Sequence, residues 1–335
     1  KMIRTFFPET PMIFNHSLSE CLGRPTYLKL ENLQTTGSFK IRGAMNCIGN
    51  LGPEQRLQGV VTCSSGNHGR AVATVAQMLG IAATICVPNW IDPLKLSAMK
   101  SKGAEIIVRG ETYDEAEQIS RGLAEQKGLI YVHPFDDLKV IAGQGTVALE
   151  ILSQLPQVGD VLVPLSGGGL AGGVGWVLKE FSSQTNVIAV SAERASVMLT
   201  SLREKKPVKM EEESTVANAL SGGIDLDNRY TFKLIDDTVD QHLVVNEDMI
   251  LDAMDYALRE LHLVVEGGGA VGLAALLREM LDTESSSLPV VVVISGGNVA
   301  TKQLLAISDV LESLQDGDDE SLPSTEEVFR ASYPR

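Results

Sequence analysis

The 335-residue chain has few aromatic residues, few basic residues relative to acidic ones, and no long apolar run. Aromatic residues make up 5% of it, and 43 acidic against 28 basic residues give a net charge of -15. Nucleic acid and anionic membrane surfaces would repel such a chain, so we expect neither as a partner. No apolar run reaches the length of a membrane span, and residues 1–10 lack the pattern of a signal peptide.

Cysteine is also scarce, and its spacing excludes the usual metal sites. The four cysteines are Cys21, Cys47, Cys63 and Cys86, and no two of them have the short spacing of a metal-binding pair. Cys63 and Cys86 fall in apolar strand patterns, where a thiol is typically part of the core. We therefore expect free thiols and a cytoplasmic location.

Glycine and aliphatic residues are plentiful, with 31 glycines and 44% hydrophobic residues. Apolar runs of strand length alternate with helical patterns, which predicts an α/β fold. Residues 58–136 are expected to form a smaller α/β domain, and residues 1–57 and 137–313 a larger discontinuous one. Residues 314–335 are acidic and predicted to be a mobile tail. Four short buried strands are expected in the smaller domain, at Val60–Cys63, Ala83–Val87, Glu105–Val108 and Leu129–His133.

A lysine stands at the start of a helical pattern, directly after a Gly-Ser turn. Gly37 and Ser38 precede Phe39 and Lys40, and Ser38 is predicted to be the helix N-cap. Partial burial at such a place lowers the pKa of an amine and makes it a nucleophile. Taken alone the motif decides little, since most lysines are solvated surface residues.

Three further turns of small residues each follow an apolar strand pattern. They are Ser64–Gly69, Ser166–Leu170 and Ser295–Asn298. Open α/β sheets bind ligands at the carboxyl ends of their strands. Glycines let the backbone approach a ligand, and the helix start that follows favours an anion.

With these four motifs in this order, the chain resembles the pyridoxal-phosphate enzymes of the tryptophan-synthase β family, known as fold type II. Within it, the chain is most similar to the branch of serine/threonine dehydratases and serine racemases. The resemblance implies two open, twisted α/β domains with pyridoxal 5'-phosphate in the cleft between them. It also implies an amino-acid substrate and a homodimer or homotetramer.

The resemblance assigns roles residue by residue. Lys40 would form the Schiff base with the cofactor, Asn67 would bind its phenolic oxygen, and Ser295 would face its ring nitrogen. The residues implied in cofactor binding are Lys40, Asn67, Gly167, Gly168, Gly169, Leu170, Glu266 and Ser295, with the glycine-rich backbone on the phosphate and Glu266 beside the ring. The residues implied in substrate binding are Ser64, Ser65, Gly66, Asn67, His68 and Phe135.

The reaction that follows is loss of a β-hydroxyl group from an L-β-hydroxy amino acid such as threonine or serine. Lys40 would remove the Cα proton, and the enamine product would hydrolyse to a 2-keto acid and ammonia. Ser65 would lie on the face opposite Lys40, where a hydroxyl could return a proton and racemise the substrate. Serine racemase therefore stays open, as does a dehydratase of hydroxyectoine breakdown, which residues 219–229 and 266–269 resemble.

Two other functions compete with that of a pyridoxal-phosphate enzyme. Gly167, Gly169 and Gly172 fit a dinucleotide fingerprint, and Glu193 ends the next strand at the matching spacing. That reading gives the lysine motif no role. A non-catalytic sensor on the same fold is the other rival, and it would not need the lysine.

A cation site distinguishes members of the branch of serine/threonine dehydratases and serine racemases from one another. Glu193 matches the first ligand of the divalent ion in similar serine racemases. Leu199 stands where a second carboxylate would be needed, and a hard cation requires oxygen ligands. We therefore do not expect a divalent metal, whereas a monovalent cation held by carbonyl groups stays compatible with the sequence.

Overall fold

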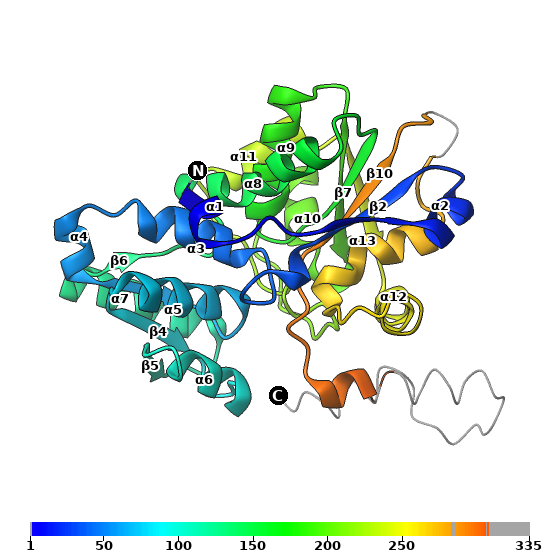
Figure 1. Cartoon of the computed structure of the whole chain (residues 1–335). Coiled ribbons are helices and arrows are strands. Elements are labelled where there is room, and N and C mark those ends of the chain that lie inside the picture. Colours follow the sequence, from blue (N-terminus) through cyan, green and yellow to red (C-terminus); the bar gives the residue numbers. More distant parts are fainter. Residues whose placement is uncertain (1, 283–285, 306, 308–335) are drawn as a thin grey trace, which may run out of the picture.

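The computed structural model describes residues 2–282, 286–305 and 307, and these form two β-sheets flanked by helices (Figure 1). The predicted α/β class is confirmed. The tail predicted at residues 314–335 lies outside the described residues. Among the described helices, none is both long enough and apolar enough to cross a membrane.

The larger sheet has six strands in the order β1-β2-β10-β7-β8-β9. β1 pairs with β2 in antiparallel register, and every other neighbouring pair is parallel. Central β10 has the sequence Val-Val-Val-Val-Ile and is wholly buried, as expected of a parallel strand with helices on both faces. The strands are β1 (Met12–Asn15), β2 (Thr26–Leu30), β7 (Asp160–Pro164), β8 (Asn186–Ala192), β9 (Gln241–Val245) and β10 (Val290–Ile294).

Alternate residues of this sheet enter two separate cores. Val290 and Val292 pack with helices α12 and α13, whereas Val291 and Val293 pack with α8, α9 and α11. The large sheet is therefore a layer between two helix layers. Its helices and short turns are α2 (His16–Leu22), η1 (Glu31–Leu33), α8 (Leu138–Gln154), α9 (Gly169–Phe181), η2 (Glu193–Ala195), α10 (Val197–Arg203), α11 (Thr231–Thr238), α12 (Glu247–Arg259) and α13 (Gly267–Leu277).

The smaller sheet has four parallel strands in the order β5-β4-β3-β6. β3 (Val60–Cys63) and β4 (Ala83–Val87) are wholly buried, as predicted. The prediction of buried strands is wrong for β5 (Glu105–Val108) and for β6, which is shorter than expected (Ile130–Tyr131), because both are edge strands and stay partly exposed. The helices around it are α1 (Met2–Phe6), α3 (Lys40–Gly49), α4 (Pro53–Gln58), α5 (Asn67–Leu79), α6 (Pro93–Lys100) and α7 (Tyr113–Lys127).

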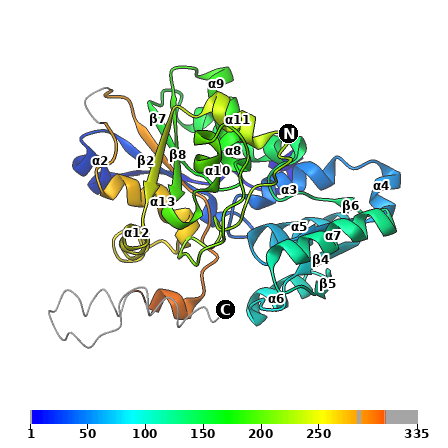
Figure 2. The ribbon, with the colours of Figure 1, turned by 180° about the vertical axis from the view of Figure 1, so that it is seen from behind.

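Helix α3 connects the two sheets. It packs against α8 on the side of the large sheet and against α5 on the side of the small one. Seen from behind, α3 lies between the two groups of elements (Figure 2). The first residue of α3 is Lys40, so the packing of this helix decides where that lysine lies.

Candidate active site

Lys40 begins α3 beside the carboxyl end of β10. The Phe39 N–H donates to the Ser295 carbonyl at 3.1 Å, and Ser38 forms an isolated β-bridge with Gly296. The prediction that Ser38 caps the helix is wrong: Phe39 is the N-cap residue, and it makes no side-chain cap bond. Pairing with Gly296 holds Ser38 in place instead.

The Lys40 amine lies in a partly buried place and is only lightly held. Its Nζ donates to the Pro134 carbonyl at 2.9 Å and lies 5.2 Å from the centre of the Phe39 ring. Burial lowers the pKa of Lys40 to about 8, although the negative charge of Glu266 acts to raise it. Near neutral pH a much larger fraction of this amine is therefore unprotonated than in an ordinary lysine, which makes it a competent nucleophile.

Asn67 and Glu266 meet across the two sheets. Asn67 begins α5 after β3, and its Nδ2 donates to Glu266 Oε1 at 2.5 Å. Its Oδ1 accepts a hydrogen bond of 2.7 Å from Asn298 Nδ2. Glu266 is buried, and burial raises its pKa to about 7 although the Asn67 hydrogen bond acts to lower it. This carboxyl group therefore gains or loses a proton near neutral pH.

The turn after β7 brings backbone N–H groups together. Gly168 adopts φ +86°, a conformation that favours glycine, and no side chain caps α9, which begins at Gly169. A Cβ atom added at Gly167 would lie 2.5 Å from the Phe135 ring, and one at Gly169 would lie 3.0 Å from the Phe135 backbone. The turn has no room for side chains at these positions, and its first N–H groups suit an anion such as phosphate. Leu170 follows in the first turn of α9 and is buried.

Ser295 ends β10 on the same side of the sheet. It is buried, and its Oγ donates to the Gly268 carbonyl in the first turn of α13 at 3.3 Å, which is long for a hydroxyl donor. Its hydroxyl group is therefore weakly held and can turn to another hydrogen-bond acceptor.

The turn from Ser64 to His68 connects β3 to α5. The Gly66 N–H donates to Ser64 Oγ at 3.2 Å, and Ser65 beside them is half-buried. The buried His68 has its Nε2 at 3.1 Å from the Val132 carbonyl. Burial lowers the pKa of His68 to about 3, and the charge of Lys40 acts in the same direction. His68 is therefore neutral near pH 7 and packs against the small sheet.

Contacts thus bring most of the sequence-predicted residues to one place. Lys40 touches Pro134, the next residue Phe135 covers the Gly167 turn, and Lys40 is close enough to Glu266 for their charges to interact. Glu266 in turn holds Asn67. The turns after β3, β7 and β10 all lie at carboxyl ends of parallel strands.

Glu193 has no part in this group of contacts. It is exposed in η2, and Leu199 is buried in α10. In the part of the chain that the structure describes, the one group of three or more possible metal-ligating His, Cys, Asp or Glu side chains lies elsewhere, at Glu117, His133 and Asp225.

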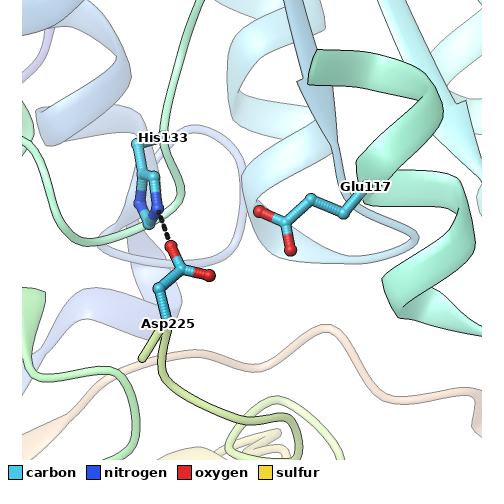
Figure 3. Close-up of side chains that lie close together, drawn as sticks. All are labelled: Glu117, His133 and Asp225. Carbon is cyan, nitrogen blue, oxygen red and sulfur yellow. Dashed lines mark hydrogen bonds and ion pairs between the residues drawn. The ribbon is translucent and has the colours of Figure 1, made fainter. Parts of the chain in front are cut away.

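Figure 3 shows how these three side chains lie close together. The sequence did not predict this group. The Asp225 carboxylate lies 3.1 Å from His133 Nε2. Arg121 donates to Asp225 and to Glu117, at 2.9 Å in each case. A single guanidinium group is therefore shared by the two carboxylates and offsets one of their two negative charges. The group joins α7 and the end of the small sheet to the loop that precedes α11, and no local pattern indicates this pairing.

A buried group of charges beneath α3 was also missed. Arg42 donates to Glu31 at 2.7 Å and to Glu150 at 2.6 Å, and Lys29 donates to Glu150 at 2.7 Å. None of the four side chains is more than 3% exposed. Because Arg42 follows Lys40 by two residues in the same helix, this balanced group fixes the start of α3. The polar Lys29 and Glu31 in the strand pattern were the available signal, but they are typical of a solvated face.

Comparison with known proteins identifies the family. Residues 3–296 match the family described as "Pyridoxal-phosphate dependent enzyme". The L-threonine ammonia-lyase of Thermotoga maritima is 41% identical over 299 residues, which cover 89% of this chain and 73% of that protein.

Solved structures show the same relationship. Maize serine racemase has a TM-score of 0.86 at 33% identity, covering 94% of this chain and 95% of the other. The processed form of threonine deaminase isoform 2 from Solanum lycopersicum has a TM-score of 0.85 at 32% identity, covering 92% of this chain and 85% of the other.

Proposed function

Because this chain belongs to the family of pyridoxal-phosphate dependent enzymes, we propose that it is an ammonia-lyase acting on an L-β-hydroxy amino acid such as threonine or serine. The products would be a 2-keto acid and ammonia. The observation that carries the proposal is the Lys40 amine, whose pKa is lowered by burial, which lies near Glu266 and which donates to Pro134, the neighbour of the Phe135 that packs on the glycine-rich turn. Relatives that bear the name L-threonine ammonia-lyase support the same reaction.

The residues at the site fit the cofactor. We propose that Lys40 forms the covalent bond with the cofactor, that Asn67 binds the phenolic oxygen of the cofactor, and that Ser295 faces its ring nitrogen. The backbone at 167–170 is assigned to the phosphate, because α9 starts there with no side-chain cap and with no space for side chains at Gly167 and Gly169. Glu266 would lie beside the ring. When bound, pyridoxal phosphate supplies an electron sink for negative charge at the substrate Cα.

The chain's own groups would then bind the substrate and move its protons. The substrate carboxylate would accept hydrogen bonds from N–H groups of the turn at 64–68, which opens α5 without a side-chain cap. Lys40, displaced when the amino acid binds, would take the Cα proton, and its lowered pKa suits a base at neutral pH. Phe135 would contact the substrate side chain. The β-hydroxyl would leave as water with the proton that Lys40 had accepted, and the enamine that remains would take up one water and hydrolyse to the keto acid and ammonia.

The neutral hydroxyl of Ser295 favours elimination. A serine does not hold a ring nitrogen protonated as an aspartate would, so the sink at the ring is weaker. Departure of a β-hydroxyl removes the negative charge from Cα and does not depend on a strong sink.

Racemisation of serine is the second candidate function. It requires a proton donor on the face opposite Lys40, and Ser65 is the group we assign to that face. The half-buried place of Ser65 in the turn before α5 and the likeness to maize serine racemase favour it. We propose racemisation as a slow side reaction.

The substrate is tested by one panel with the purified holoenzyme. L-Ser, D-Ser, L-Thr, the 3-hydroxyaspartates and hydroxyectoine-derived amino acids are compared, and ammonia, keto acid and enantiomer are measured in the same samples. We expect keto acid from L-Thr or L-Ser, and Ser65→Ala should remove D-product while sparing most elimination. Racemisation faster than ammonia release would assign a racemase. Turnover of the hydroxyectoine-derived substrates alone would assign the catabolic dehydratase.

We also propose a homodimer or homotetramer in the cytoplasm. All four cysteines are free thiols, which agrees with a reducing compartment. Within the chain, we propose a small domain at 58–136 and a large one made of 1–57 and 137–313, with α3 in contact with helices of both.

A further inference from the structure

A row of hydrogen-bonded polar side chains connects Arg70 to Glu266 through Asn298 and Asn67. Arg70 donates to Asn298 Oδ1 at 2.6 Å, Asn298 Nδ2 donates to Asn67 Oδ1 at 2.7 Å, and Asn67 Nδ2 donates to Glu266 Oε1. Arg70 and Asn67 are three residues apart in α5 and therefore lie on the same helix face. Asn298 follows β10 of the large sheet, so the row crosses from one sheet to the other.

The row has a fixed direction. A guanidinium group only donates hydrogen bonds, and a backbone carbonyl only accepts them. Asn298 lies between two such groups, because its Oδ1 faces Arg70 and its Nδ2 also donates to the Thr36 carbonyl at 2.8 Å. Its Nδ2 must then face Asn67, which turns the Asn67 oxygen toward Asn298 and its N–H groups toward Glu266.

The packing around Asn298 leaves it little freedom. A Cβ atom at Gly37 would lie 2.5 Å from Asn298 Oδ1, and Gly37 itself adopts φ +75°. The Gly297 N–H donates to the Gly37 carbonyl at 2.9 Å. The segment that precedes Lys40 therefore holds one side of Asn298, and Arg70 holds the other.

We propose that Arg70 is a positioning residue for the cofactor. Through Asn298 it holds the Asn67 amide with its N–H groups toward Glu266 and toward the phenolic oxygen that we assigned to Asn67. This inference rests on the proposed function. It concerns the orientation of a hydrogen-bond donor, and Arg70 itself touches neither cofactor nor substrate.

The test compares three holoenzyme variants by visible absorbance, visible circular dichroism of the bound cofactor, and the separate values of kcat and KM. Arg70→Met removes the donor and keeps the length, whereas Arg70→Lys keeps a donor. Arg109→Met is the matched control, because Arg109 is exposed. We expect Arg70→Met to shift the dichroism band and to lower kcat about fivefold, about the net contribution of one hydrogen bond, because the Asn67 amide loses its fixed orientation, with KM little changed. Arg70→Lys should stay near the wild type in all readouts.

A second variant keeps the test decisive if Arg70→Met does not fold. Asn298→Asp retains an acceptor for Arg70 but has no N–H for Asn67, so it should shift the same band. The double variant Arg70→Met/Asn298→Asp should lose no more kcat than either single variant, because both substitutions break the same row of hydrogen bonds. An unchanged band and kcat in Arg70→Met, or equal losses in Arg70→Lys or Arg109→Met, would overturn the positioning role alone. A wild-type protein without a Lys40-dependent band would instead contradict the proposed function.

Discussion

Glu266 and Lys40 are two site residues whose protonation depends on burial. Burial raises the pKa of the Glu266 carboxyl group to about 7 and lowers the pKa of the Lys40 amine to about 8. Both shifts favour the neutral form, because the cost of burying each charged group exceeds the attraction between the two opposite charges. The site is thus prepared for proton transfer near neutral pH.

Glu266 makes a pH-dependent contribution to stability that can be measured in the cofactor-free protein. Its pKa is raised from 4.5 to about 7, so its favourable contribution is complete below pH 4.5 and is lost as the pH rises to about 7. The loss is on the order of 3 kcal/mol of the free energy of unfolding. Glu266→Gln should therefore gain stability relative to the wild type between pH 5 and pH 8, as followed by melting temperature. A difference that does not change with pH would show that Glu266 is not buried as a neutral acid.

At this scale the sequence indicates candidate residues for the site but not their partners. Lys40, Asn67 and Ser295 could be named because each stands in a short local motif. The Asn67–Glu266 contact joins residues 199 positions apart, and the Arg70–Asn298 contact joins residues 228 positions apart. No local pattern contains such pairs, so only the folded chain reveals them.

The turn between β7 and α9 is the element to which we assign the cofactor phosphate, so we expect cofactor binding to depend directly on its position. Gly167 lies against the Phe135 ring, and α9 opens without a side-chain cap. Displacement of this turn by a few tenths of an ångström would misplace N–H groups that we assign to the phosphate.

Gly167→Ala should weaken binding of pyridoxal phosphate about tenfold or more, because its methyl group would meet the Phe135 ring and move the turn. Equilibrium titration of the cofactor-free protein by fluorescence measures the dissociation constant. Gly122→Ala is the matched control: Gly122 lies within α7 with nothing within 4 Å of an added Cβ. That control should bind the cofactor normally. Equal affinity of both variants would place the phosphate elsewhere.

At the scale of elements, apolar runs predicted the central strands well and the edges poorly. β10, β7 and β3 are buried on both faces, so a continuous apolar run indicates them directly. The run at Leu129–His133 yields only two residues of β6, because only Ile130 and Tyr131 pair with β3. Whether an apolar run becomes an edge strand depends on the order of strands in the sheet, and the periodicity of the sequence does not indicate that order.

Across the whole molecule, several polar contacts join the surroundings of the small sheet to those of the large one. Asp225 in the loop before α11 meets His133 and Arg121, and Asn298 after β10 meets Asn67 and Arg70. The second group contains Asn67, and His133 in the first group is two residues before Phe135, so both groups adjoin residues that we assign to the site. They therefore influence how the two parts of the chain enclose the site.

The Asp225 contacts should stabilise the fold only where that carboxyl group is ionised. Its hydrogen bond with His133 lowers its pKa below 3.8, so the stabilisation is present above that pH and is lost as the pH falls through the lowered value. Asp225→Asn should lower the free energy of unfolding by about 1 kcal/mol at pH 7. The deficit should shrink toward pH 3, as followed by melting temperature. Asp227→Asn, in the same loop and exposed, is the control. A deficit that is equal at both pH values would mean that charge has no part in it.

The family could be predicted from the order of the motifs along the whole sequence, and the comparisons confirm the family. The buried charges beneath α3 could not be predicted from the sequence. Burial of Lys29, Glu31, Arg42 and Glu150 is tolerated only when all four lie together in the folded chain. Folding of the complete chain creates that balance.

The most direct test of the account is the identity of the lysine that holds the cofactor. The purified holoenzyme is reduced with borohydride, digested, and the modified peptide is identified by mass spectrometry. We predict that the cofactor mass is found on Lys40, that reduction abolishes the visible band, and that Lys40→Ala lacks both the label and turnover, while the exposed-site control Lys100→Ala keeps them. A label on another lysine, or wild-type turnover by Lys40→Ala, would contradict the account.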